Sequence, residues 1–144
     1  MMTLDLAERI AAAALDHGSR LSLQPLTVAV LDAGGHLVIL KRQDGSGILR
    51  PAIAGGKAWG ALGMGHGSRM LAKRAEAAPA FVNALASASD GRMIPAPGGV
   101  LIRDEHDRVV GAIGISGDTS DHDEACAVAG IAAVGMAADT GEGH

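Results

Sequence analysis

Four short runs of the chain are rich in β-branched and aliphatic residues and predict β-strands. They are Leu26 to Asp32, His36 to Arg42, Val100 to Arg103 and Arg108 to Ser116. The first two runs are joined by Ala33-Gly34-Gly35 and the last two by a charged turn at 104–107. Connections this short are typical of β-hairpins. Two hairpins without crossover helices predict an antiparallel sheet.

Apolar residues at helical spacing, with residues that start and end helices, predict the other elements. Thr3 can cap a first helix that Gly18 is expected to end. The apolar line of this helix consists of Leu6, Ile10 and Ala14. Further helices are expected to begin at Arg50-Pro51, at Ser68 and at Pro79, and a last one to run from about 121 to about 138. This order predicts an α/β (α+β) fold, with helices packed on a central antiparallel sheet.

The composition indicates one domain with an unusual core. The chain has 144 residues, 48% of them hydrophobic and 19% charged, and no repeat or linker divides it, so residues 1–144 are expected to form a single domain. One Trp, one Phe and no Tyr leave aliphatic residues and Met to build the core. The 21 glycines allow helices and strands to approach closely.

Charge and cysteine content narrow the function classes. A net charge of −4 and the scarcity of aromatic residues argue against a nucleic-acid surface. The single cysteine excludes an internal disulfide. Because the chain shows neither a signal-peptide pattern nor an apolar run that could cross a bilayer, we expect a cytoplasmic protein without membrane contact.

The segment from Pro97 to Glu124 carries the clearest sign of a functional site. A glycine-opened strand and a second, glycine-containing strand lead into a loop and helix start with four carboxylates and two hydroxyls. Asp121 and Glu124 resemble a capping box, so one interpretation is helix initiation. The other is general acid–base chemistry or a cation site, because clustered carboxylates raise the pKa of some of them. A metal site at Asp121, His122 and Asp123 lacks any fixed ligand spacing.

Lys57 has two interpretations of equal weight. Its helical neighbours are small or apolar, so its side chain emerges from an apolar helix face. In the functional interpretation, Lys57 binds a carboxylate group of a ligand or takes part in acid–base chemistry. In the structural interpretation, it forms a buried ion pair with Asp123 or Glu124.

Several motifs, in this order, resemble the GlcG/HbpS family, which includes the C-terminal domain of PduO-type corrinoid adenosyltransferases. They are Val28 to Gly35 with Arg42, Ile53-Ala54, Lys57-Ala58, Pro97 to Gly99, Gly111 to Gly117, and Asp123-Glu124. The resemblance covers nearly the whole chain. It implies a profilin-like domain, often assembled into octamers from dimers. Some members of the family bind haem, and others have no settled activity, so the resemblance indicates fold more strongly than chemistry.

The resemblance makes His17 a candidate axial ligand of haem. The alternative is that the dipole at the C-terminal end of the first helix stabilises this histidine. The residues predicted to contact a ligand are His17, Arg42, Gly98, Gly99, Ser116 and Asp118.

Two function classes remain open. The first is a small-ligand-binding protein, with haem or another tetrapyrrole as the candidate that the resemblance implies. The second is a cofactor-free enzyme of the isomerase, lyase or hydrolase type that acts on a small organic acid. In that enzyme Arg42 and Lys57 would anchor a carboxylate, and Asp123 or Glu124 would transfer protons, so Lys57, Asp123 and Glu124 are the candidate catalytic residues.

Two further expectations concern the site and the assembly. Arg42, Lys57, Gly98-Gly99 and the start of the last helix are expected to converge on one pocket, because a helix N-terminus attracts anions and the two cations complement it. A homo-oligomer, either an octamer or a tetramer, is expected from the resemblance and from the small residues on the last helix. These residues are Ala125, Ala129, Ala132 and Gly135.

Overall fold

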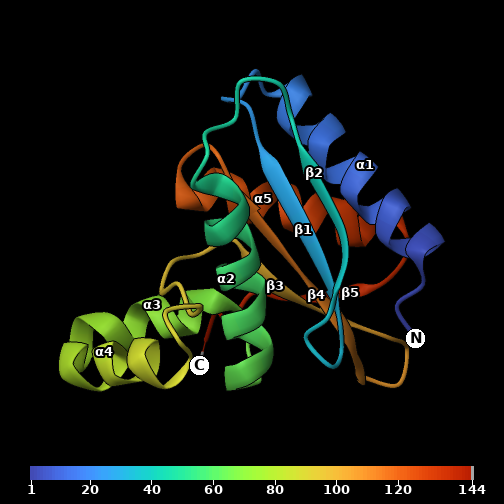
Figure 1. Ribbon diagram of the computed structural model, residues 1–144. Coiled ribbons are helices and arrows are strands. Elements are labelled where there is room, and N and C mark those ends of the chain that lie inside the picture. Colours follow the sequence, from blue (N-terminus) through green and yellow to red (C-terminus); the bar gives the residue numbers. More distant parts are fainter. Residues whose placement is uncertain (144) are drawn as a thin grey trace.

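A five-stranded antiparallel sheet forms the centre of the protein (Figure 1). The computed structural model describes residues 1–143. The strands are β1 (Thr27–Asp32), β2 (Leu37–Arg42), β3 (Gly99–Arg103), β4 (Val109–Ser116) and β5 (Ala137–Asp139), in the spatial order β2-β1-β4-β3-β5. The helices are α1 (Leu4–Arg20), α2 (Arg50–Met64), α3 (Ser68–Ala77), α4 (Pro79–Ala88) and α5 (Ser120–Ala133).

The two faces of the sheet are covered by different helices. Alternate side chains of a strand point to opposite faces, and the buried residues follow this rule. Val28, Val30 and their neighbours pack with α1 and α5, whereas Leu31, Leu101 and Ala112 pack with α2. Figure 1 shows α2 in front of the sheet and α1 and α5 on the other side. The sheet therefore separates two apolar layers.

The structure confirms the predicted α/β class, the antiparallel sheet and both hairpins. It also confirms the cap at Thr3, whose hydroxyl accepts a hydrogen bond from the Leu6 amide at 3.1 Å. The predictions that Ser68 and Pro79 begin helices are confirmed as well.

Two predicted helix ends are wrong. The last helix ends at Ala133 rather than near residue 138, because Gly135 takes a positive φ of 75° and the chain then pairs with β3 as β5. Gly18 does not end the first helix, which runs on to Arg20. Gly18 is buried instead, and a Cβ there would lie 2.7 Å from Leu26 Cδ1, so the glycine allows α1 to approach the start of β1.

The helix α2 lies directly on the backbone of the central strands. A Cβ on Gly114 of β4 would overlap the carbonyl oxygen of Ala54, and one on Gly99 of β3 would overlap that of Lys57. Large side chains are therefore excluded from this contact. Glycine and alanine take the place that aromatic side chains fill in many cores.

We expect Gly114→Ala to lower the free energy of unfolding by about 1–3 kcal/mol or more, because α2 must move away from the sheet. The measurement is denaturant unfolding of the purified variant. The control is Gly63→Ala in α2. The added Cβ would meet only Met93 Cε, at an ordinary contact distance of 3.7 Å. Removing this glycine is expected to stabilise the helix by up to about 1 kcal/mol. Equal effects of the two substitutions would contradict the close approach.

Candidate functional site

A buried ion pair joins α2 to α5 at the end of the sheet where β4 finishes. The Lys57 ammonium donates to Asp123 Oδ2 at 3.1 Å and to the carbonyl oxygen of Ile115 at 2.9 Å. The two side chains are 3% and 1% exposed. A buried charge needs a partner of opposite sign, and each residue provides it for the other. The structure thus shows the ion pair that was one of the two interpretations of Lys57.

Gly98 leaves room for the side chain of Lys57, and Gly99 leaves room for the backbone carbonyl of the same residue. Gly98 has a φ of 122°, and a Cβ there would lie 2.9 Å from Lys57 Nζ. The Gly99 amide donates to the Ser68 hydroxyl at 2.9 Å, which anchors the start of β3 to α3. These two predicted ligand contacts therefore border the lysine itself.

The loop before α5 helps to hold Asp123 in place. Asp123 also accepts a hydrogen bond from the Asp118 amide at 3.0 Å. Burial raises the pKa of Asp123 and lowers the pKa of Lys57, while the charge of each partner opposes the shift of the other. Both groups are enclosed by protein, so an outside ligand does not reach the ammonium in this conformation.

Asp118 caps two chain segments at once. Its carboxylate accepts from the amides of Gln24 at 2.9 Å and Thr119 at 2.8 Å, and His122 Nδ1 lies 2.6 Å from Oδ1. The Gln24 amide, followed by the contact with His122, lowers the pKa of Asp118 to about 2. This residue ties the loop before β1 to the start of α5.

Ser116 and Arg42 lie at the same end of the sheet but have other partners. Thr27 pairs with Arg42 on one side and with Ser116 on the other, so the three residues form a row across adjacent strands. Arg42 donates to the carbonyl oxygen of Ser46 at 2.8 Å, and Arg50 donates to the Ser116 hydroxyl at 3.0 Å. The structure does not bring Arg42 into hydrogen-bond contact with Lys57 or Asp123.

Glu124 pairs with Arg69 of α3, a residue that the sequence analysis missed. The guanidinium contacts Glu124 at 3.0 Å and also Asp121, and these carboxylates raise the pKa of Arg69. Nothing in the local sequence around Arg69 indicated this contact, because 55 positions separate it from Glu124. The available signal was the excess of carboxylates around the start of α5, which favours a cation from elsewhere in the chain.

His17 belongs to α1, a helix that carries none of the other residues of this cluster. It is half-buried in the last turn of α1, together with Arg20, where the helix dipole favours a positive charge. Because α1 packs on the face of the sheet opposite α2, His17 is separated by the sheet from the residues of α2.

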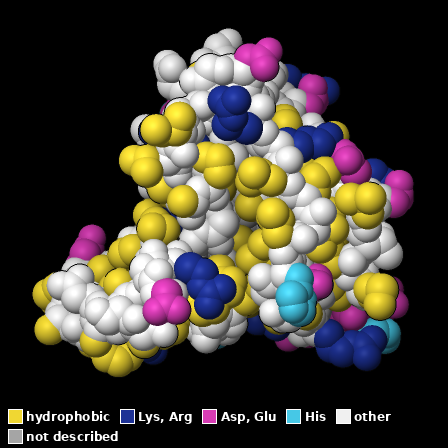
Figure 2. Space-filling model, viewed as in Figure 1, with side chains coloured by type: hydrophobic (Ala, Val, Ile, Leu, Met, Phe, Trp, Pro, Cys, Tyr) yellow, Lys and Arg dark blue, Asp and Glu magenta, His cyan; other side chains and the backbone are white. Residues whose placement is uncertain are grey.

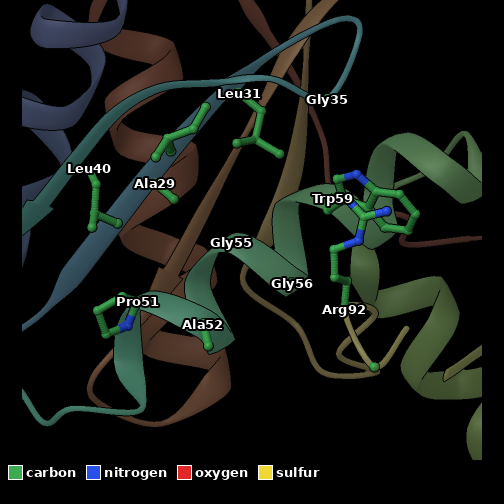
Figure 3. Close-up of a pocket in the computed structure, with 12 residues that line it drawn as sticks. Ala29, Leu31, Gly35, Leu40, Pro51, Ala52, Gly55, Gly56, Trp59 and Arg92 are labelled. Atoms are coloured by element: carbon green, nitrogen blue, oxygen red, sulfur yellow. The ribbon is translucent and has the colours of Figure 1, made fainter. Parts of the chain in front are cut away.

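An apolar groove lies on the α2 face, between this helix and the β1–β2 hairpin (Figure 3). Its volume is about 440 Å³. Its lining contains one charged residue, Arg92, whose guanidinium lies 4.0 Å from the ring centroid of Trp59. Sequence reasoning missed this groove, since none of the residues predicted to form a site lines it.

Two features of residues 1–143 bear on cofactors and membranes. No group of three or more His, Cys, Asp and Glu side chains in this range comes together to hold a metal ion. No helix within the same range is long and apolar enough to span a bilayer. The cytoplasmic location stays a prediction.

Comparison with known proteins identifies the family. A model described as haem degrading protein HbpS-like matches residues 2–132. The chain belongs to the HbpS-like family. The family resemblance read from the sequence is thereby confirmed, whereas no match was found among curated proteins.

Solved structures share this HbpS-like fold. A double mutant of HbpS from Streptomyces reticuli is 29% identical, with 91% of this chain and 85% of that chain covered and a TM-score of 0.77. Protein ORFY of Klebsiella pneumoniae is 25% identical over 93% of this chain and 90% of that one, with a TM-score of 0.83. The PduOC chain of a complex with haem is 23% identical, with 94% of this chain and 96% of that chain covered and a TM-score of 0.84. This likeness concerns the fold alone.

We expect Lys57→Met to lower the free energy of unfolding by about 3–5 kcal/mol at pH 7, because it leaves the Asp123 carboxylate buried without a cation. Adding Asp123→Asn to the same chain should recover part of the loss. Denaturant unfolding measures both effects. The control is Lys41→Met, which removes a partly exposed pair with Glu8 and should cost less than about 1 kcal/mol. A loss as small as that of the control would show that the buried pair contributes little.

We expect Asp118→Asn to lower the melting temperature at pH 6 but not near pH 2. The pKa of Asp118 is lowered in the folded state, so its carboxylate stabilises the fold above its ordinary pKa of 3.8, and this contribution disappears as the pH falls from about 4 to about 2. Thermal unfolding across this range gives the difference between the two proteins. Asp16→Asn, in an exposed pair with Arg20, is the control. If the difference in melting temperature between the two proteins did not change with pH, the Asp118 carboxylate would not be the stabilising group.

Proposed function

We propose that this HbpS-like protein binds a small ligand, and that the ligand is haem or another tetrapyrrole. The observation that carries the proposal is the family match over residues 2–132, whose description refers to haem. The haem complex of PduOC supports it at the level of the fold, because a protein with this architecture accommodates such a ligand.

The side-chain geometry gives less support to the enzymatic alternative. Lys57 and Asp123 neutralise each other inside the protein, and Glu124 is paired with Arg69. An acid–base catalyst has to reach the proton that it transfers, directly or through one water molecule. The roles of Lys57, Asp123 and Glu124 as catalytic residues therefore require the two ion pairs to open.

We also propose that the protein forms a homo-oligomer, either an octamer or a tetramer. Large apolar side chains on the surface support this, since Ile48 and Leu49 are 95% and 69% exposed and Phe81 is 50% exposed. Ala125 and Ala132 of α5 are exposed too, so α5 offers a second surface on which helices can meet closely.

Haemin added to the purified protein is expected to give a Soret band that differs from that of haemin in buffer and saturates as haemin is added. The measurement is a difference absorption spectrum at pH 7.5 and micromolar protein. A spectrum identical to that of haemin in buffer would contradict the proposed function.

The same titration with His17→Ala tests the sequence-based prediction that His17 ligates the iron. Loss of the coordinated band in this variant would support His17 as the ligand. An unchanged band would contradict this role and favour the alternative, in which the dipole of α1 stabilises His17.

A further inference from the structure

The α2 face of the sheet is covered only in part. The helix α2 lies over β4, β1 and β3 and leaves the outer strand β2 open, so Leu37 and Leu40 are 58% and 41% exposed. Figure 2 views this side of the molecule and shows hydrophobic side chains gathered where α2 and β2 lie in Figure 1. The groove of about 440 Å³ runs between these two elements.

Small residues give the groove a smooth floor. Ala29 of β1 and Pro51, Ala52, Gly55 and Gly56 of α2 line it, as Figure 3 shows. A Cβ placed on Gly55 would meet no atom within 4 Å, so the space above this residue is empty. A floor without protruding side chains suits a flat ring system.

One end of the groove combines an aromatic ring with a cation. The Arg92 guanidinium lies 4.0 Å from the centroid of Trp59, and its Nε donates to the carbonyl oxygen of Ser89 at 3.3 Å. Within residues 1–143 no carboxylate forms an ion pair with Arg92, and it is the only charged residue among those lining the groove. Its terminal nitrogens are therefore open to an anionic group.

We propose that this groove binds the ring of a planar conjugated ligand that carries a carboxylate. The ring lies on the floor beside Gly55, its apolar edge contacts Leu37 and Leu40, and its carboxylate pairs with Arg92. A tetrapyrrole with acidic side chains has this chemistry, so the inference rests on the proposed function and names the site for it. The volume falls within the range of about 300–1,000 Å³ usual for small-molecule sites.

The assignment separates the ring site from two residues predicted earlier. The sheet lies between the groove and His17, and Lys57 is enclosed with Asp123 at the end of β4. Within one chain, a ring in the groove therefore contacts neither of them.

The test uses protoporphyrin IX, which has no iron and so requires no axial ligand. The chain has one Trp and no Tyr, so its intrinsic fluorescence reports Trp59 alone. We expect saturable quenching of this fluorescence by protoporphyrin. Gly55→Leu, which fills the empty space, should weaken binding about tenfold or more without lowering the melting temperature. Arg92→Ala, at an exposed position, should weaken binding about fivefold or more and leave the fold intact.

Gly63→Leu is the matched control. It makes the same substitution in the same helix, but its side chain meets Met93 instead of the groove, so protoporphyrin should bind as to the parent protein. Binding to Gly55→Leu and Arg92→Ala with parental affinity would overturn the groove assignment, even where haemin still gives its Soret band. A change of mass in light scattering for Gly55→Leu, with binding unchanged, would show that a second copy covers the groove and would also overturn it. Absence of any porphyrin or haemin band would overturn the proposed function together with this site.

Discussion

The pairing of Lys57 with Asp123 is the interaction on which the arrangement of this protein depends. A lysine ammonium and a carboxylate, each almost fully buried, are favourable only when they meet in good geometry. To meet, α2 on one face of the sheet and α5 after β4 must both reach the same end of it. Glycine is then required at positions 98 and 99, because a Cβ at Gly98 would crowd the end of the lysine side chain and a Cβ at Gly99 would overlap the lysine carbonyl group.

The close contact of α2 with the central strands has a second consequence. Because Gly99 and Gly114 let the helix approach β3 and β4, α2 is centred over β4, between β1 and β3, and leaves most of β2 uncovered. Leu37 and Leu40 remain partly in solvent, and the groove beside Trp59 results from this incomplete cover. One packing arrangement thus produces both the tight core and the open apolar surface.

Polar chemistry and apolar surface are separated in this member of the HbpS-like family. The carboxylates at the start of α5 are matched by Lys57, Arg69 and the Asp118 amide, so this segment ties α5 to α2 and α3. The groove has little polar character apart from Arg92, whose nitrogens face no carboxylate within residues 1–143. This division supports the proposal that the protein holds a flat, mostly apolar molecule rather than moving protons on a small acid.

Local patterns in the sequence were enough to predict the strands, both hairpins, the cap at Thr3 and the antiparallel sheet, because each depends on residues close together in the chain. The end of the last helix was not predictable in this way, since β5 exists only because β3 offers an edge for residues 137–139. The rule that buried charges are paired limited the candidate partners of Lys57 to the carboxylates of Asp123 and Glu124. The tertiary structure alone decided three things. They are the choice of Asp123 as the partner of Lys57, the contact of Glu124 with Arg69, and the groove between α2 and β2. All three depend on the distance between segments remote in sequence, and that distance is set by how closely small residues allow helix and sheet to pack.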